Sequence, residues 1–252
     1  MQEITVPGKS YSGTNSPGIE SNGNLLIQFS DAWDPFYVRK MPTWKRSMDI
    51  IGSLLALIIF SPLFILIAAL IKIVSPGPIF FKQERMGYGG KKFTFLKFRS
   101  MKVNSDASFH QKYYRQLITD DKGRCSPMAK LDGSNPHIIP FGKLLRKTYL
   151  DELPQLINVL RGEMSLVGPR PPIPYEVSEY INWHNGRFDA IPGMTGLWQV
   201  SGKNKLTFQE MVRLDISYSR NLSFLSDLKI LLLTPLAILS DLIESTRTKI
   251  GV

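Results

Sequence analysis

Two adjacent carboxylates, Asp151 and Glu152, are the side chains in this sequence best suited to chemistry on a phosphate. Arg146 precedes Asp151 by five residues, and Arg170 follows in a rigid Gly-Pro-Arg-Pro-Pro turn. Phosphoryl transfer needs a nucleophile, a divalent ion that neutralises phosphate charge, and fixed cations. One carboxylate can attack, the other can bind the ion, and the arginines can hold the phosphate. These four residues therefore predict a phosphoryl-transfer site.

A structural role explains the two carboxylates as simply. Apolar side chains recur on one face of residues 152–161, Gly162 follows them, and Asp151 stands where an N-cap belongs. Carboxylates in a first helical turn are stabilised by unpaired N–H groups and by the helix dipole. The same helix N-terminus can also hold a phosphate oxygen. The pair alone leaves both roles open, and its arginine neighbours are what favour catalysis.

A second candidate segment, residues 192–204, combines three glycines with Trp198 and Lys203. It could cradle a nucleotide with Lys203 on a phosphate, although its spacing matches neither a P-loop nor a dinucleotide fingerprint. The alternative is a tight loop with Trp198 in the core. The three histidines and the single cysteine show no zinc-ligand spacing, so we assign them no metal role.

The elements expected around these residues are mainly α-helices with a few short β-strands. Strand-like pieces at residues 79–81 and 92–98 flank a glycine-rich turn. Helices are expected at about 107–117 and 207–220, in addition to 152–161. Residues 228–243 are strongly apolar but contain a proline, which favours an interfacial amphipathic helix or one packed on an anchor. Residues 1–38 have the composition of a flexible N-terminal tail.

Residues 50–71 form an uncharged and mostly apolar run of 22 residues, and a helix needs roughly 20 to cross the hydrocarbon core of a bilayer. A simple spanning anchor is the first interpretation. However, Ser61 and Pro62 lie at the centre, where proline removes a backbone donor and kinks a helix. The serine hydroxyl can bond a carbonyl that the proline leaves free. A helix broken at this point is therefore a second interpretation.

Basic residues flank the apolar run on both sides, with Lys45 and Arg46 before it and Lys72 after it. Basic flanks mark the cytoplasmic side of a membrane segment, so both ends are expected on the same side. We therefore predict a re-entrant membrane helix hairpin over residues 44–73. A cytoplasmic catalytic domain is expected to follow over residues 74–245.

Net charge and cysteine content limit the kinds of binding partner and of cellular compartment that suit this chain. The chain carries 31 Lys and Arg against 21 Asp and Glu, a formal charge of +10. Such a charge suits nucleic acid, anionic lipid headgroups or phosphorylated small molecules. The apolar run favours membrane lipids and phosphorylated small molecules over nucleic acid. The single Cys125 cannot form an intrachain disulfide, so nothing ties the domain to an oxidising compartment.

Several blocks, in order, resemble the monotopic phosphoglycosyl transferases, the bacterial sugar transferase family that starts lipid-linked glycan assembly. The resemblance covers about residues 44–239. Its markers are Lys45-Arg46-Ser47-Met48-Asp49-Ile50, the Ser61-Pro62 break, Lys97-Phe98-Arg99-Ser100-Met101, Leu150-Asp151-Glu152-Leu153-Pro154-Gln155-Leu156, Ser165-Leu166-Val167-Gly168-Pro169-Arg170-Pro171 and Pro192-Gly193-Met194-Thr195-Gly196-Leu197. The chain departs from the family at Asn135-Pro136-His137, where relatives usually carry an Asp-Pro-Arg-like run.

This resemblance implies a two-step transfer at the cytoplasmic face of a bacterial inner membrane. A UDP-sugar gives its sugar phosphate to the enzyme with release of UMP, and polyprenyl (undecaprenyl) phosphate then accepts it. By the same resemblance, Asp151 carries the covalent intermediate and Glu152 binds Mg²⁺. The residues that would hold the diphosphate or line the site are Lys97, Arg146, Arg170, Lys203 and Asp215.

Two other functions stay open on the residues alone. A non-enzymatic basic membrane adaptor would explain the anchor and the charge, but not the Asp-Glu, Gly-Pro-Arg-Pro and glycine-rich blocks. A membrane-bound, Mg²⁺-dependent phosphohydrolase would use the same carboxylates with water as the acceptor. The sequence also leaves open the sugar, the final glycan and the oligomeric state, a homodimer included.

Overall fold

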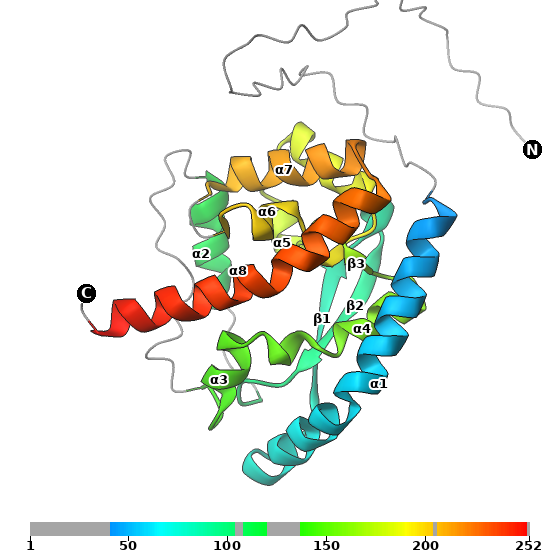
Figure 1. The fold of residues 1–252 in the computed structure, drawn as a ribbon. Coiled ribbons are helices and arrows are strands. Elements are labelled where there is room, and N and C mark those ends of the chain that lie inside the picture. Colours follow the sequence, from blue (N-terminus) through cyan, green and yellow to red (C-terminus); the bar gives the residue numbers. More distant parts are fainter. Residues whose placement is uncertain (1–40, 104–107, 120–136, 204–205, 251–252) are drawn as a thin grey trace, which may run out of the picture. The chain divides into compact units, whose positions relative to one another are not determined.

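The computed structural model of this chain describes residues 41–103, 108–119, 137–203 and 206–250. The predicted tail at residues 1–38 lies outside them, as does most of the polar segment before residue 137. Within the described residues the fold is mainly helical with a few short strands, as predicted (Figure 1). The helices are α1 (Thr43–Val74), α2 (Ser108–Thr119), α3 (Gly142–Lys147), α4 (Gln155–Arg161), α5 (Pro174–Val177), α6 (Leu197–Val200), α7 (Phe208–Arg220) and α8 (Phe224–Ile250).

In the part of the chain that the structure describes, four short strands form two separate pairs. β1 (Phe80–Met86) and β2 (Lys92–Phe98) make an antiparallel hairpin in which Phe80 faces Phe98 and Met86 faces Lys92. β3 (Ser165–Val167) and β4 (Gly193–Thr195) pair in parallel. The predicted strand at 92–98 is confirmed, and the strand before it is longer than the predicted 79–81. The hairpin turn needs left-handed backbone at two positions, which glycine adopts without steric cost, and Gly89 and Gly90 have φ of 60° and 70°.

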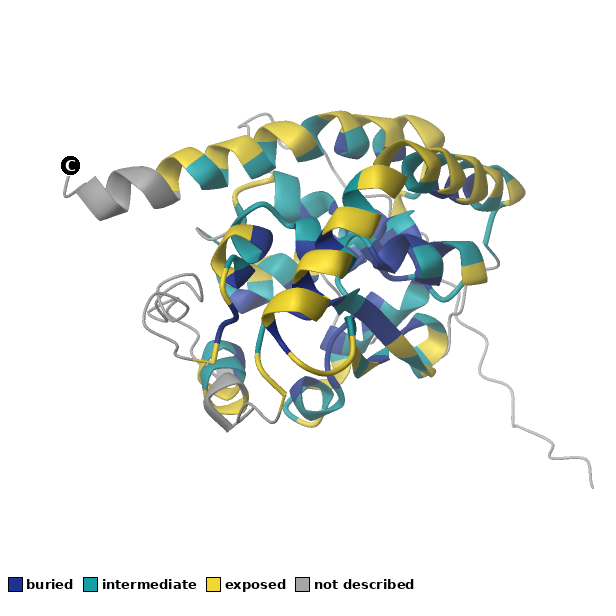
Figure 2. Cartoon of the chain, turned by 90° about the horizontal axis from the view of Figure 1, so that it is seen from below, coloured by how far each residue is buried: buried dark blue, intermediate teal, exposed yellow. Residues whose placement is uncertain are grey.

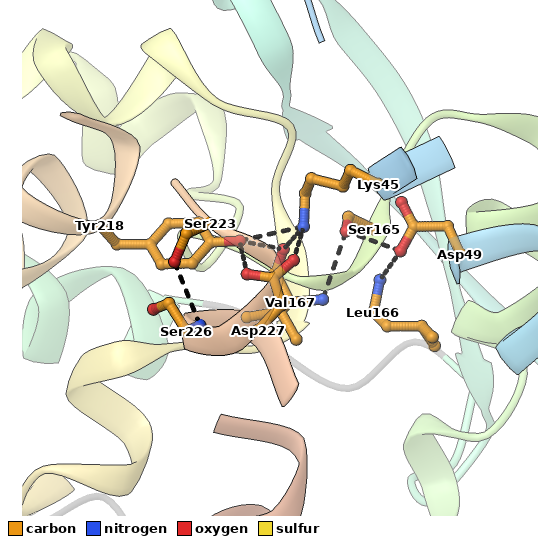
Figure 3. Close-up of polar contacts among 9 residues, drawn as sticks. All are labelled: Lys45, Asp49, Ser165, Leu166, Val167, Tyr218, Ser223, Ser226 and Asp227. Carbon is orange, nitrogen blue, oxygen red and sulfur yellow. Dashed lines mark hydrogen bonds and ion pairs between the residues drawn. The ribbon is translucent and has the colours of Figure 1, made fainter. Parts of the chain in front are cut away.

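The long apolar helix α1 packs on the rest of the protein at its first turns. Lys45, Asp49 and Ser53 follow one another at intervals of four residues, so they share one helix face, and all three are buried. The carboxylate of Asp49 accepts hydrogen bonds from the Ser165 hydroxyl at 2.8 Å and from the Leu166 N–H at 2.9 Å (Figure 3). This end of α1 is therefore joined to β3 by one hydrogen bond between side chains and one between a side chain and the backbone.

The ammonium group of Lys45 is completely buried and makes three close contacts (Figure 3). It forms an ion pair with Asp227 of α8 at 2.6 Å and donates hydrogen bonds to the Val167 carbonyl at 2.8 Å and the Tyr218 hydroxyl at 3.0 Å. The Tyr218 hydroxyl donates in turn to Asp227 at 2.6 Å. A buried charge is tolerated only when it is paired and hydrogen-bonded, and both conditions are met here.

The neighbouring Arg46 caps the C-terminal end of α4. Its two terminal nitrogens donate to the carbonyls of Val159 and Leu160, both at 2.6 Å. The last carbonyls of a helix lack internal partners, so a cation placed there satisfies them and complements the dipole. The sequence analysis counted Lys45 and Arg46 as charges that flank a membrane segment. In the structure, both side chains instead make contacts inside the protein. Their partners lie far away in sequence.

The other end of α1 packs on a different part of the same unit. Ile67 and Ile71 are buried in an apolar cluster with Phe98, Ile139 and Leu145. Between the two attached ends, α1 is long and apolar enough to cross a membrane, and it exposes most of its large side chains (Figure 2). It is the one such helix within the described ranges.

The predicted break at Ser61-Pro62 is not an interruption, because α1 stays helical through Pro62. Proline removes the hydrogen bond that would reach the carbonyl of Ile58, four residues earlier. The Ser61 hydroxyl donates to that carbonyl at 2.8 Å and so replaces the missing donor. Figure 1 shows the blue and cyan halves of the helix running in different directions.

The remaining predicted helices are present. α2 and α7 correspond to the helices expected at 107–117 and 207–220, and α7 begins with a capping box between Thr207 and Glu210. The apolar segment at 228–243 lies inside α8, which continues through Pro235. Large apolar side chains of α8 are exposed at helical spacing, and they are Leu225, Leu228, Leu232, Leu236, Leu239 and Ile243. We call this set the α8 stripe.

Breaking the Lys45–Asp227 ion pair on one side should destabilise the protein strongly. Lys45→Met leaves the Asp227 carboxylate buried without a cation, and loss of one partner of a buried pair costs about 3–5 kcal/mol. Chemical unfolding of the protein in detergent micelles measures the change. The double variant Lys45→Met/Asp227→Leu removes both charges and should recover much of the loss.

The exposed ion pair between Lys92 and Glu84, at 2.8 Å, is the matched control. Lys92→Ala should change the free energy of unfolding by less than about 1 kcal/mol, because solvent screens the pair. If Lys45→Met and Lys92→Ala lowered the free energy of unfolding equally, burial of the Lys45–Asp227 pair would add nothing to its contribution to stability.

Candidate active site

Asp151 and Glu152 lie in a short 3₁₀ turn over Leu150–Glu152, and α4 begins only at Gln155. The predicted helix start at residue 152, with Asp151 as its N-cap, is therefore wrong by three residues. The segment is instead held by bonds that reach three residues back, since the N–H groups of Glu152 and Leu153 donate to the carbonyls of Tyr149 and Leu150 at 3.0 and 3.4 Å. The predicted helix end is confirmed, because α4 stops at Arg161 and Gly162 takes the left-handed conformation with φ of 80°.

The residue that leads into this turn has an unusual backbone. Tyr149 has φ of 57°, in the left-handed region that a bulky aromatic residue rarely adopts. Its carbonyl accepts a hydrogen bond from the N–H of Glu152 at 3.0 Å. The reversal at Tyr149 lets the chain leave α3 and enter the turn that presents the two carboxylates.

Asp151 is only 5% exposed, and its surroundings hold opposing charges. Burial raises the pKa of its carboxyl group to about 6, and the adjacent Glu152 adds to the rise, while Lys97 and Arg146 oppose it. Burial also lowers the pKa of the Lys97 ammonium on β2, against the attraction of Asp151. The structure thus brings Lys97, Arg146, Asp151 and Glu152 into one electrostatic cluster.

Arg146 comes to this cluster from the last turn of α3. Its Nη1 lies 3.5 Å from the Met101 sulfur, in the segment that follows β2. The side chain is half-buried rather than fully solvated. The two cations of the cluster thus come from different elements, Lys97 from the hairpin and Arg146 from the helix before the carboxylates.

Arg170 is held in a partly buried ion pair with Glu176. Its two terminal nitrogens lie 3.0 and 3.2 Å from the carboxylate oxygens of Glu176, and one also donates to the Tyr114 hydroxyl at 2.9 Å. Burial opposes both charges, but their attraction raises the pKa of Arg170 and lowers that of Glu176. A phosphate at Arg170 would have to share the guanidinium with Glu176.

Arg85 of β1 is a functional candidate that the sequence analysis did not single out. It is 8% exposed, donates to the Pro171 carbonyl at 2.8 Å, and its guanidinium lies 4.8 Å from the centre of the Phe95 ring. Its Nε has no hydrogen-bond partner among the described residues. Burial and the nearby Arg170 lower its pKa to about 10, and Glu152 acts in the opposite direction. The charge of Arg85 therefore acts both on the Asp151 cluster, through Lys97 and Glu152, and on the pair of Arg170 with Glu176.

Asp215 of α7 is linked to the Arg170 turn through one intervening arginine, Arg187. It is buried and forms an ion pair with Arg187 at 2.7 Å, and Arg187 donates to the Arg170 carbonyl at 3.3 Å. Burial raises the pKa of Asp215 to about 6, and Arg187 opposes the rise. The structure therefore connects Asp215 to the Arg170 turn through Arg187, and not directly to Asp151.

Part of the glycine-rich segment packs in the interior, and its last residues lie beside the candidate site. Trp198 is buried, which favours the tight loop with Trp198 in the core. At Gly193 of β4, an added side chain would collide with the backbone of Gly168, so the two strands approach too closely for anything larger. Lys203 forms an ion pair with Asp241 of α8 at 2.7 Å and contacts the Tyr149 hydroxyl. Lys203 is thereby placed beside the turn that carries Asp151.

The described residues contain no group of three or more His, Cys, Asp or Glu side chains that could hold a metal ion. The adjacent Asp151 and Glu152 nevertheless suit Mg²⁺, which binds through one or two carboxylates and shares the oxygens of a substrate phosphate. Burial raises the pKa of Asp151 and the adjacent Glu152 adds to the rise, and a divalent ion between the two would stabilise the charged carboxylates. The donor set therefore fits Mg²⁺ held jointly with a phosphorylated substrate.

Comparison with known proteins places most of the chain in one family. Residues 40–241 match the model of a family described as bacterial sugar transferase. The chain is 40% identical over 190 residues to the exopolysaccharide production protein ExoY of Rhizobium meliloti, across 75% of this chain and 83% of that protein.

Two longer relatives have names that state a reaction. The chain is 40% identical over 202 residues to the undecaprenyl-phosphate galactose phosphotransferase of Salmonella typhimurium, across 77% of this chain and 40% of that protein. It is 37% identical over 205 residues to the UDP-glucose:undecaprenyl-phosphate glucose-1-phosphate transferase of Xanthomonas campestris pv. campestris, across 78% of this chain and 39% of that protein.

Replacing the buried carboxylate with a neutral amide should stabilise the fold. The pKa of Asp151 is about 6 in the folded protein, above the ordinary 3.8, so the folded state binds a proton more tightly than the unfolded state. The carboxylate's cost is therefore absent below about pH 4 and complete above about pH 7. Asp151→Asn should raise the free energy of unfolding by about 1–3 kcal/mol at pH 8 and by little at pH 4. Unfolding curves at both pH values test this, and a loss of stability at pH 8 would contradict it.

Proposed function

Since this chain belongs to the bacterial sugar transferase family, we propose that it is an undecaprenyl-phosphate sugar-1-phosphate transferase that starts exopolysaccharide or capsule assembly. The observation that carries the proposal to particular residues is the buried Asp151 with Lys97 and Arg146 around it. A carboxylate is a competent nucleophile toward phosphorus, and a covalent intermediate splits one difficult transfer into two easier ones.

In the proposed first step, a carboxylate oxygen of Asp151 attacks the phosphorus that carries the sugar in a UDP-sugar. The new bond joins that phosphorus to Asp151, and the bond to the departing UMP breaks. In the second step, an oxygen of undecaprenyl phosphate attacks the same phosphorus. The bond to Asp151 breaks, the carboxylate is restored, and an undecaprenyl-diphospho-sugar leaves.

The cations around Asp151 serve to stabilise charge that develops on the phosphates. Lys97 and Arg146 act directly on the nucleophile's charge, and preorganised cations in a partly dry site are worth more than solvated ones. Glu152 would hold Mg²⁺, which when bound would neutralise negative charge on the diphosphate. Arg170 would bind phosphate only by sharing its guanidinium with Glu176, and Arg85 adds positive potential at both groups. Lys203 and Asp215 border the site through Tyr149 and Arg187.

The membrane arrangement that fits this reaction is a re-entrant α1 on the cytoplasmic face of the inner membrane, with the catalytic unit at 74–245 below it. A helix of 32 residues is about 48 Å long, and a straight span would carry its second end across a bilayer core of about 30 Å. Both ends of α1 pack on one catalytic unit, through Lys45 at the first end and Ile71 at the second. The exposed α8 stripe would lie against lipid.

Substitution of the carboxylates tests the chemistry. Asp151→Asn should abolish UMP release from UDP-sugars, because an amide is not a nucleophile toward phosphorus. Glu152→Gln should lower the rate roughly 10- to 100-fold through weaker Mg²⁺ binding. A screen of UDP-sugars with undecaprenyl phosphate, scored by UMP release and by sugar transferred to lipid, measures both effects and identifies the sugar.

Two outcomes would contradict these assignments. Near-normal transfer by Asp151→Asn would remove Asp151 as the nucleophile. Free sugar phosphate in place of the lipid product, in the presence of acceptor, would favour the phosphohydrolase. Lys92→Ala, on an exposed strand position, is the control that should transfer normally.

Labelling of single cysteines tests the topology. In a Cys125→Ser background, cysteines placed at the exposed positions Thr43 and Lys102 should both react only with a reagent that reaches the cytoplasm. Reaction of the two positions from opposite sides would establish a span instead. Pro62→Ala restores a backbone donor at the bend, so some molecules should then insert through the membrane. An unchanged labelling pattern would show that the proline does not set the topology.

A further inference from the structure

Three non-glycine residues have left-handed φ among the described residues, namely Phe141 at 54°, Tyr149 at 57° and Lys203 at 33°. Such conformations are costly for residues with a side chain, and they persist only where the surroundings hold them. Tyr149 and Lys203 lie 54 residues apart in sequence, yet they contact each other directly. Two of the three strained residues, Tyr149 and Lys203, thus belong to one constellation of contacting side chains. Tyr149 precedes Asp151 by two residues.

A single carboxylate oxygen holds that constellation together. The Oδ2 of Asp241 accepts the Lys203 ammonium at 2.7 Å and the Tyr149 hydroxyl at 2.9 Å. The Lys203 ammonium also donates to the Tyr149 hydroxyl and lies 4.0 Å from the centre of its ring. Charge-assisted hydrogen bonds are stronger and more directional than neutral ones. The side chains of Lys203 and Asp241 are 21% and 19% exposed, so solvent screens their ion pair only in part.

The three residues come from three different elements. Tyr149 precedes the Leu150–Glu152 turn, Lys203 follows α6, and Asp241 lies on α8. On α8, Asp241 lies between Leu239 and Ile243 in sequence, but faces the domain while those two are exposed in the α8 stripe. The helix that presents apolar side chains outward therefore presents a carboxylate inward to the residue before the turn.

We propose that Tyr149, Lys203 and Asp241 form a positioning triad that holds the Leu150–Glu152 turn and makes its geometry depend on the docking of α8. The triad acts through Tyr149 on the placement of Asp151 and does not touch the reacting atoms. The inference rests on the proposed function for the meaning of that placement, because there Asp151 is the nucleophile and α8 lies against lipid. Loss of the Asp241 contact would free Tyr149 from its left-handed conformation.

The charges around Tyr149 keep its hydroxyl group protonated, so the hydroxyl remains a hydrogen-bond donor. Burial raises the pKa of its hydroxyl, and Asp241 together with Glu152 and Asp151 raises it further. The hydroxyl therefore keeps its proton throughout the physiological pH range, and it can donate to Asp241 without itself acting as a base. Its contribution is geometric, which separates it from Lys97 and Arg146.

Two conservative variants test the triad in the full-length protein in lipid nanodiscs. Tyr149→Phe removes the hydroxyl but keeps the ring beside Lys203, and Asp241→Asn removes the charge but keeps the shape. Each should lower kcat for UMP release roughly 10- to 100-fold, because a small displacement of a reacting group has that effect. KM for the UDP-sugar should stay within about twofold, since uniform substrate binding is untouched. Lys203→Arg should retain more activity than Lys203→Met, because it keeps the cation.

The matched control is Thr234→Val on the same inward face of α8. Thr234 shares a hydrogen bond of 2.8 Å with Thr195 of β4, so this variant also cuts a link between α8 and the domain. It should leave kcat unchanged if only the triad positions the turn. A fall in kcat equal to that of Asp241→Asn would overturn the proposal in favour of general loosening. Unchanged kcat in both Tyr149→Phe and Asp241→Asn would also overturn it.

Hydrogen exchange of the Leu150–Glu152 amides separates this proposal from the proposed function. Exchange there should be faster in Asp241→Asn than in the wild type, and unchanged in Thr234→Val, without any substrate. A wild-type protein that transfers no sugar phosphate would end the proposed function, and the triad would then be judged on exchange alone. Faster exchange in Asp241→Asn would support it, and equal exchange would overturn it.

Discussion

The buried ammonium group of Lys45 is the contact on which the arrangement of the protein depends. An ammonium has three donors, and here they meet Asp227, the Val167 carbonyl and the Tyr218 hydroxyl. Because these partners come from α8, β3 and α7, one charged group joins the apolar helix α1 to three parts of the catalytic unit. A lysine can be buried at the start of an apolar helix only because every donor is satisfied.

The two halves of the candidate site are connected to this junction. Arg46, next to Lys45, closes the end of α4, whose other end follows the turn with Asp151. The carbonyl that Lys45 holds belongs to Val167, from which the chain continues directly into the turn with Arg170. The apolar helix α1 is therefore part of the scaffold that sets the distance between the carboxylates and the arginine turn. The apolar helix and the candidate site thus share one scaffold.

Local signals in the sequence were sufficient where the structure is decided locally. Gly162 ended α4 as expected, and the helix expected from about residue 207 begins there with a capping box, because caps act within one helical turn. Arg146 was expected beside Asp151 from its position five residues earlier, and Lys97 from the family resemblance alone. Burial of Lys45 and Arg85 could not, since residue type alone predicts a solvated cation and their partners lie far away in sequence. The same holds for Asp241, whose pairing with Lys203 depends on where α8 crosses the domain.

The ion pair between Lys45 and Asp227 also has a consequence for biosynthesis. The two residues are separated by 182 positions, so the lysine at the head of the apolar helix has no counter-ion until Asp227 has been synthesised. Until then the ammonium group stays solvated, because an unpaired charge is costly to bury. Final seating of the first turns of α1 therefore depends on α8, which is made much later.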